Sequence, residues 1–212
     1  TLIHNSSIHH GTNYMINLFS NKYYFYGYKS YIKDFISNCK ICQMNKIVKV
    51  PHKSQFAYTR PDGINEELQI DFMGPMIRTP RGFKYILSMI DSYDGYCRLV
   101  PCVGCDTLES VQALKNRWFY ALGLVENVKT DNGPAFANSV NDVVSKIFGY
   151  NTKFSTTYYP QSQGVVERLN KKVKYCLSIV AQEAEPVHPE LHVDWDLHLD
   201  AISFLHNTTI YS

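Results

Sequence analysis

Apolar side chains recur every three or four positions in two stretches near the start of the chain. Residues 13–20 and 28–38 both have this spacing, which predicts two amphipathic helices. The apolar stripe of the second stretch consists of Tyr28, Ile32, Phe35 and Ile36, with Lys29 and Lys33 between them. From Asn45 to about Gly63 the chain becomes polar and loses any period, with Pro51 and Pro61 inside it. This change predicts a linker after a small helical region.

Strand patterns begin after the linker. Residues 68–73, 85–90 and 96–103 are strand-like runs joined by Gly- and Pro-containing turns, which predicts a three-stranded antiparallel meander. The pattern then alternates between helices and strands, and alternation of this kind indicates parallel strands added to the same sheet. We predict helices at 107–122, 136–148, 163–182 and 195–207, and strands at 126–130 and 152–155. The expected fold class is α/β, with a mixed five-stranded sheet flanked by helices.

Composition supports a folded chain with an uneven charge distribution. Of the 212 residues 45% are hydrophobic and 19% are charged, which is typical of a folded protein, and no stretch is long enough to span a membrane. Residues 1–56 carry seven Lys, one Asp and no Arg or Glu, for a net charge of +6, and the remainder carries −4. A basic first quarter suggests contact with a polyanion, although a solvated lysine face is the ordinary alternative. The opening Thr1-Leu2-Ile3-His4 falls in mid-pattern, so we expect a fragment.

Four residues of the first region have the spacing of a metal site. His4 and His9 precede Cys39 and Cys42, and two imidazoles with two thiolates form a normal tetrahedral Zn²⁺ set. The other four cysteines do not suggest a disulfide framework, which favours reduced thiols in an intracellular compartment. His10 is an alternative to His9, and buried thiols beside a terminal His pair are the alternative to zinc. A region this small needs a structural metal ion of this kind to fold. We predict a zinc-binding domain at 1–46, a linker at 47–62 and one further domain at 63–212.

Three carboxylates stand out in the second region. Asp71 lies within an apolar strand, Asp131 follows a strand and Glu167 lies on the long helix. Singly, each has an ordinary explanation as a strand-end cap, a turn residue or a surface residue. Together they would repel one another strongly, and divalent cations would remove that repulsion. On the helix, Lys171 and Lys174 share the face of Glu167, where they are either a surface pair or contacts to phosphate.

The carboxylate spacing resembles a known signature. Fifty-nine residues separate Asp71 from Asp131, and 35 separate Asp131 from Glu167. The sequence segments around them are Gln-Ile-Asp-Phe-Met-Gly-Pro, Thr-Asp-Asn-Gly-Pro-Ala-Phe and Tyr-Pro-Gln-Ser-Gln-Gly-Val-Val-Glu-Arg-Leu-Asn. This pattern resembles the Asp, Asp-35-Glu core of retroviral and Ty3/gypsy-type LTR retroelement integrases, and the His-His-Cys-Cys order resembles their zinc domain. In that family a Gly follows the second His, which would favour His10 before Gly11, whereas the spacing from His4 favours His9.

The resemblance implies an RNase H-like fold and an enzyme. Asp71, Asp131 and Glu167 would bind two Mg²⁺ or Mn²⁺ ions, with one structural Zn²⁺ elsewhere, for 3′-end processing and strand transfer by a polynucleotidyl transferase with endonuclease activity. DNA contacts are expected at Tyr158, Gln163, Asn170, Lys171 and Lys174. The implied partners are element ends, target DNA, further copies of the chain and a host tethering factor, with no membrane. The implied location is the nucleus after a cytoplasmic particle stage, and a small basic β-barrel domain is expected after the core.

Two other functions compete with this prediction. A domesticated, integrase-derived DNA-binding protein without catalytic activity would keep the fold, but the loss of a carboxylate would be its mark, and all three are present. An RNase H-like nuclease would explain the carboxylates but not the upstream His and Cys residues. The sequence does not indicate the element or host, the terminal sequence, the target preference, the oligomeric state or continued activity.

Overall fold

A computed structural model describes residues 4–5, 8–45, 61–131, 139–154, 164–184 and 194–209. It divides into two compact units, which we treat separately. The larger comprises residues 53–173 and 193–207, and the smaller comprises residues 1–52, 174–192 and 208–212. Most of the predicted linker at 47–62 and most of the loop before the long helix fall outside the described residues. No helix in the described part of the chain is long and apolar enough to cross a membrane.

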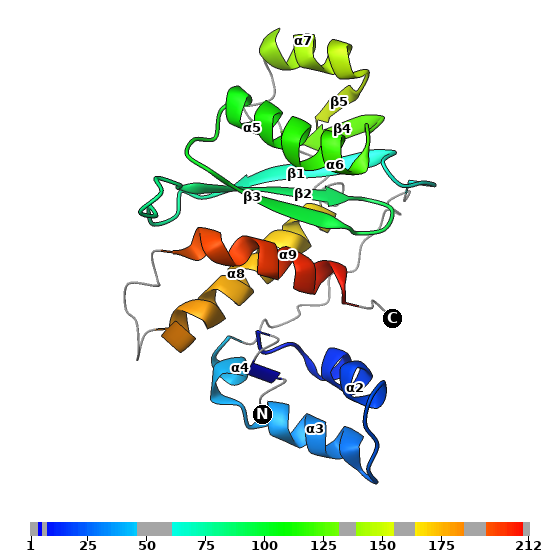
Figure 1. Cartoon of the computed structure of the whole chain (residues 1–212), viewed down its shortest axis with the longest axis vertical. Coiled ribbons are helices and arrows are strands. Elements are labelled where there is room, and N and C mark those ends of the chain that lie inside the picture. The colour runs from blue at the N-terminus through cyan, green and yellow to red at the C-terminus, as the bar shows by residue number, and fades with distance from the viewer. Residues whose placement is uncertain are drawn as a thin grey trace. The chain divides into compact units, whose positions relative to one another are not determined.

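The larger unit is built on a five-stranded sheet with the order β3-β2-β1-β4-β5 (Figure 1). Strand β1 pairs antiparallel with β2 and parallel with β4, while β2–β3 is antiparallel and β4–β5 is parallel. The strands are β1 Glu67–Met73, β2 Tyr85–Asp91, β3 Cys97–Cys102, β4 Asn127–Thr130 and β5 Asn151–Phe154. The predicted meander and the two added parallel strands are therefore confirmed, and so is the mixed α/β fold class.

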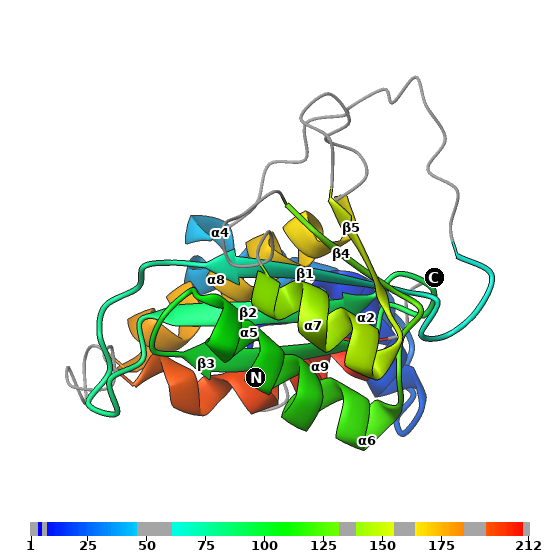
Figure 2. The ribbon, with the colours of Figure 1, turned by 90° about the horizontal axis from the view of Figure 1, so that it is seen from above.

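One face of the sheet carries the main hydrophobic core. Leu68 and Ile70 of β1 point into it, together with Leu87, Met89 and the fully buried Trp118. Helices α5 (Thr107–Ala113), α6 (Tyr120–Leu122) and α7 (Ser139–Phe148) lie over this face, with α5 beside α7 (Figures 1 and 2). The expected helix at 107–122 is continuous, but its middle, Leu114–Phe119, is π-helical. Period counting alone does not reveal such a wider turn.

The opposite face packs against the first half of α8 and against α9 (Figure 1). Helix α8 is Gly164–Ala184 and α9 is Leu199–Asn207, preceded by a 3₁₀ turn at Trp195–His198. Val166, Leu169 and Val173 form a buried apolar stripe on α8, which lies within the helix predicted at 163–182. Asn207 fastens α9 to the edge of the sheet, since its side chain accepts from the Cys97 N–H at 2.8 Å and donates to the Cys97 carbonyl at 2.9 Å.

The smaller unit contains three short helices, α2 Thr12–Ser20, α3 Tyr28–Ser37 and α4 Lys40–Met44. The first two confirm the helical spacing, whereas α4 was not predicted because five residues carry too short a pattern. Among the described residues, their shared core has four buried members, Met15, Ile32, Ile36 and Cys42, with partly buried side chains such as Phe19 and Phe35 packed against them. A core this small is insufficient to hold a fold by burial alone. The N-terminal cap of α3 is Gly27 with a φ of 82°, a left-handed conformation that favours glycine.

Candidate metal centres

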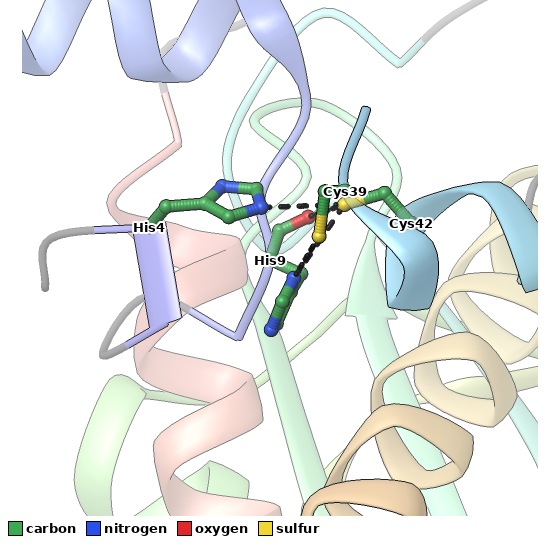
Figure 3. Close-up of side chains that lie close together, drawn as sticks. All are labelled: His4, His9, Cys39 and Cys42. Atoms are coloured by element: carbon green, nitrogen blue, oxygen red, sulfur yellow. Dashed lines mark hydrogen bonds between the residues drawn. The ribbon is translucent and has the colours of Figure 1, made fainter. Parts of the chain in front are cut away.

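Four side chains of the smaller unit converge on one point (Figure 3). The metal-ligating atoms of His4, His9, Cys39 and Cys42 all lie within 4.8 Å of one another. The Cys39 Sγ lies 3.2 Å from His9 Nδ1, and the Cys42 Sγ lies 3.3 Å from His4 Nε2 and 3.6 Å from His9 Nδ1. Helix α4 explains the Cys-x2-Cys spacing, because Cys39 caps it and Cys42 lies in its first turn.

These distances fit a tetrahedral zinc ion. Zn–S bonds of about 2.3 Å and Zn–N bonds of about 2.0 Å at tetrahedral angles place sulfur and nitrogen roughly 3.5 Å apart, close to the separations observed. Burial, with the charge of His9 second, lowers the pKa of His4 to about 4, which favours the neutral ring that binds metal. Burial and Cys39 raise the pKa of Cys42 to about 12. A cation is what converts so buried a thiol to the thiolate.

His10 lies outside this cluster. Although it is buried, its ring packs against Tyr14 with centroids 4.3 Å apart, and its Nε2 lies 3.3 Å from the Thr209 hydroxyl. The turn between the two histidine positions explains the choice, because Ile8 and His9 adopt left-handed φ values of 49° and 51°. Such strained backbone persists only where its surroundings hold it. The turn aims His9, and not His10, at the two sulfur atoms.

The second candidate centre lies in the larger unit, where the sheet meets α8. Asp71 is half-buried on β1, while Asp131 directly after β4 and Glu167 in the first turn of α8 are exposed. In the β1–β4 register Gln69 lies beside Lys129, so two more positions along both strands bring Asp71 and Asp131 together. The fold thus explains how residues 60 positions apart become neighbours.

Electrostatics in the larger unit shows that these three carboxylates interact. Burial, followed by the negative charges of Asp131 and Glu167, raises the pKa of Asp71 from 3.8 to about 6. Yet among the described residues only the His/Cys set brings three or more ligand atoms within 4.8 Å. The carboxylates therefore face one another at longer range. An all-oxygen donor set with mutual repulsion fits hard divalent cations such as Mg²⁺ or Mn²⁺.

Asn170 lies against the first of these carboxylates. Its Nδ2 donates a 2.7 Å hydrogen bond to Asp71 Oδ2, and this bond lowers the pKa of Asp71 in opposition to burial. The Asn170 Oδ1 is buried and has no hydrogen-bond partner among the described residues. This residue was expected to contact DNA, and the structure gives its amide a protein partner as well.

The remaining expected DNA contacts divide into two groups. Lys171 and Lys174 are exposed on α8, on the same side as Glu167. Within the described chain neither lysine forms an ion pair with Glu167, so the surface-pair explanation has no support in the geometry. Tyr158 and Gln163 lie outside the described residues.

Sequence reasoning did not single out Gln69. It is fully buried on β1, with Asp71 two positions further on the same face, and its side chain contacts both Glu67 and α8. The available signal was a run of polar residues at alternate positions, Glu67, Gln69 and Asp71, within an otherwise apolar strand.

Comparisons with known proteins agree with this architecture. Residues 1–48 match the family model described as an integrase zinc binding domain, and residues 61–160 match the integrase core domain. The Gag-Pol polyprotein of baboon endogenous virus (strain M7) is 30% identical over 154 residues, covering 72% of this chain and 9% of the polyprotein. The Pro-Pol polyprotein of feline foamy virus is 26% identical over 175 residues, covering 82% of this chain and 15% of the polyprotein.

A solved structure shares the fold. The simian T-cell lymphotropic virus intasome in complex with PP2A regulatory subunit B56 gamma contains a chain that matches with a TM-score of 0.58 and 19% identity, covering 98% of this chain and 66% of that chain. A zinc-binding domain followed by an RNase H-like core defines the class of protein. The chain carries an integrase zinc binding domain and an integrase core domain, and its relatives include retroviral Gag-Pol and Pol polyproteins. It spans only a small part of the polyproteins that it matches.

Proposed function

We propose that this chain carries the active site for metal-dependent 3′-end processing and strand transfer of retroelement DNA. The observation that carries the proposal is the closeness of Asp131 and Glu167 to Asp71, whose pKa is raised to about 6 first by burial and then by these two negative charges. The integrase core match supports the same class of reaction. An integrase-derived DNA-binding protein without activity remains the alternative that the experiment below must exclude.

The carboxylates would hold the ions that the reaction needs. Two Mg²⁺ or Mn²⁺ ions, when bound, activate the attacking oxygen and stabilise the leaving oxygen of an in-line phosphoryl transfer. Asp71, Asp131 and Glu167 supply hard oxygen ligands from three separate elements. Asn170 orients the Asp71 carboxylate through its 2.7 Å hydrogen bond. Lys171 and Lys174, on the exposed side of α8, are placed to contact phosphates of the DNA end, and Asn170, Tyr158 and Gln163 complete the proposed contacts.

The smaller unit would serve a structural role. His4, His9, Cys39 and Cys42 would hold one Zn²⁺, which links the N-terminal segment to α4. The match to an integrase zinc binding domain supports this assignment. The related intasome is described as a complex with a PP2A regulatory subunit. We extend the proposal to assembly with further copies of the chain on element and target DNA, to a host tethering factor and to action in the nucleus.

A strand-transfer assay tests the proposed chemistry. Pre-trimmed duplex ends are incubated with target DNA and the chain in Mg²⁺ or Mn²⁺, and joined products are measured. Asp71→Asn preserves size and removes the charge, so we expect joining to fall by about 10³-fold or more, as when an essential member of a catalytic unit is removed. Asp200→Asn is the matched control, because Asp200 is exposed on α9 and its loss should leave joining unchanged.

The same assay separates the two candidate functions. Normal joining by Asp71→Asn would show that this residue is not a metal ligand of the reaction. A wild-type chain that binds duplex DNA but neither joins ends nor binds Mn²⁺ would instead establish the DNA-binding alternative.

A further inference from the structure

A cluster of buried polar side chains lies on the sheet face that bears the carboxylates. Glu67 and Gln69 of β1 and Lys129 of β4 are each 9% exposed or less. Burying polar and charged groups is costly unless they bind one another, so a cluster of this kind must be held by specific contacts. Its contacts include one to α8 and one to β4, the elements that lead to Glu167 and Asp131.

The first contact joins β1 to α8. The Gln69 Oε1 accepts a hydrogen bond from the Val166 backbone N–H at 3.3 Å. Val166 lies in the first turn of α8, where N–H groups have no partner within the helix. Gln69 therefore caps the helix from a neighbouring strand. Asp71 lies two positions after Gln69 on β1, and Glu167 directly follows Val166 on α8. This single bond therefore joins the strand and the helix that bear these two carboxylates.

The second contact joins the amide to the rest of the cluster. The Gln69 Nε2 donates to Glu67 Oε1 at 3.2 Å, and the Ser92 hydroxyl donates to the same oxygen at 3.0 Å. The Lys129 Nζ lies 3.7 Å from that oxygen. Lys129 stands beside Gln69 in the β1–β4 register and two positions before Asp131. The cluster thus also reaches the strand that leads to the remaining carboxylate.

We infer that Gln69 is a positioning residue that sets the separation of Asp71 and Glu167. The inference rests on the proposed metal-dependent function. An amide is required because one end must accept from Val166 and the other must donate to Glu67. A hydrocarbon can do neither, and a carboxylate could accept but would place a second negative charge beside Glu67. Gln69 has no exposed surface, so it acts through these contacts and not by touching DNA.

The test compares Gln69→Met with Ile70→Val in the full chain. Methionine keeps the length and removes both hydrogen bonds, while Ile70→Val changes an equally buried residue on the opposite face of β1. In Gln69→Met we expect kcat for joining pre-trimmed ends to fall about 10- to 100-fold, with the Mn²⁺ concentration at half activity raised, as when a residue that orients metal ligands is lost. KM for DNA should change less than about twofold. Ile70→Val should leave kcat, the Mn²⁺ concentration at half activity and KM for DNA near their wild-type values.

Two readouts do not depend on activity. Calorimetric Mn²⁺ affinity should fall in Gln69→Met, and the Val166 amide should exchange with solvent faster while amides of β2 stay protected. The exchanged pair Glu67→Gln with Gln69→Glu restores one donor, one acceptor and the net charge, so it should recover part of the lost Mn²⁺ affinity. Wild-type Mn²⁺ affinity and Val166 exchange in Gln69→Met would overturn the inference.

Asp71→Asn, measured alongside, separates this inference from the proposed function. Normal joining by Asp71→Asn refutes the function itself. Joining that is lost in Asp71→Asn but normal in Gln69→Met, at the wild-type Mn²⁺ requirement, refutes only the role of Gln69.

Discussion

The two candidate metal centres differ in how closely the protein alone gathers its ligands. In the smaller unit, four ligand atoms from three short segments already lie within 4.8 Å of one another, and three of the four residues are buried. In the larger unit, Asp71 is half-buried while Asp131 and Glu167 are exposed, and their oxygens are not gathered to the same degree. The first geometry is typical of closed structural sites, and the second of sites that leave positions open for a substrate.

Charge explains much of this difference. Neutral imidazoles and thiols can approach one another without metal, and hydrogen bonds such as that between Cys39 and His9 hold them at 3.2 Å. Three carboxylates repel, and the raised pKa of Asp71 records that repulsion together with burial. A closed centre can therefore stabilise a small fold, whereas the repulsion between the three carboxylates costs free energy when no cation is bound.

The largest expected effect is loss of the closed centre. Replacing Cys39 and Cys42 together with serine should abolish zinc binding and unfold α2 to α4, because zinc binding in small domains supplies about 10–16 kcal/mol and the core described for these helices is small. Circular dichroism and metal analysis should show lost helicity and a fall from about one zinc per chain to none. The exposed Cys105→Ser is the control.

Substituting each histidine in turn tests which of them binds zinc. His9→Ala should lose zinc and His10→Ala should keep it, since His10 packs against Tyr14 away from the sulfur atoms. The opposite result would transfer the ligand role to His10. Zinc and helicity that survive the double cysteine change would remove the zinc assignment altogether.

In metal-free buffer, repulsion in the open centre, formed by Asp71, Asp131 and Glu167, should make the free energy of unfolding depend on pH. The pKa of Asp71 is raised from 3.8 to about 6 in the folded state, so folding favours its protonated form. Its favourable contribution is present below pH 4 and is lost as pH rises through 6, which should lower the free energy of unfolding by on the order of 2 kcal/mol. Urea unfolding at pH 4 and pH 7 should reveal this loss in wild type.

Asp71→Asn provides the comparison. This substitution should remove most of the fall in the free energy of unfolding between pH 4 and pH 7, and it should leave the metal-free core at least as stable as wild type at pH 7. Saturating Mn²⁺ should stabilise wild type but not the variant, by about 2.7 kcal/mol at a hundred times its Kd. Identical pH profiles in the two proteins would show that the carboxylates do not repel measurably.

The sequence predicted the fold largely because its two periods are clear. The strand run at 68–73 buries Leu68, Ile70 and Met73, and the stripe of Val166, Leu169 and Val173 recurs every three or four positions, so these patterns were sufficient to identify the two elements. The π-helical turn at Leu114–Phe119 and helix α4 were missed, because one changes the period locally and the other is too short to show one.

The candidate sites could be predicted from the sequence where the spacing of residues alone indicates the chemistry. Cys-x2-Cys and the 35-residue gap before Glu167 are visible in a linear sequence. The choice of His9 over His10 depends on two left-handed residues, which no pattern encodes. Gln69 was missed for a related reason. Its partners Glu67 and Val166 are 2 and 97 positions away, and only the packing of α8 on β1 shows that one amide serves both.

The smallest expected effect concerns the lysines beside the open centre. Replacing Lys171 and Lys174 with glutamate should weaken binding to duplex DNA, because both are exposed on the Glu167 side of α8. Each lost phosphate contact should reduce the slope of log affinity against log salt by about 0.9, so the double variant should lose about 1.8. Fluorescence anisotropy over a salt series measures this slope. Arg117→Glu together with Lys146→Glu makes the same charge change on the helix at 107–122 and on α7, which lie over the opposite face of the sheet, and should leave the slope unchanged. An equal fall in both variants would mean that net charge alone attracts the DNA. A reduced slope in the α8 variant alone would mark the side on which DNA approaches the open centre.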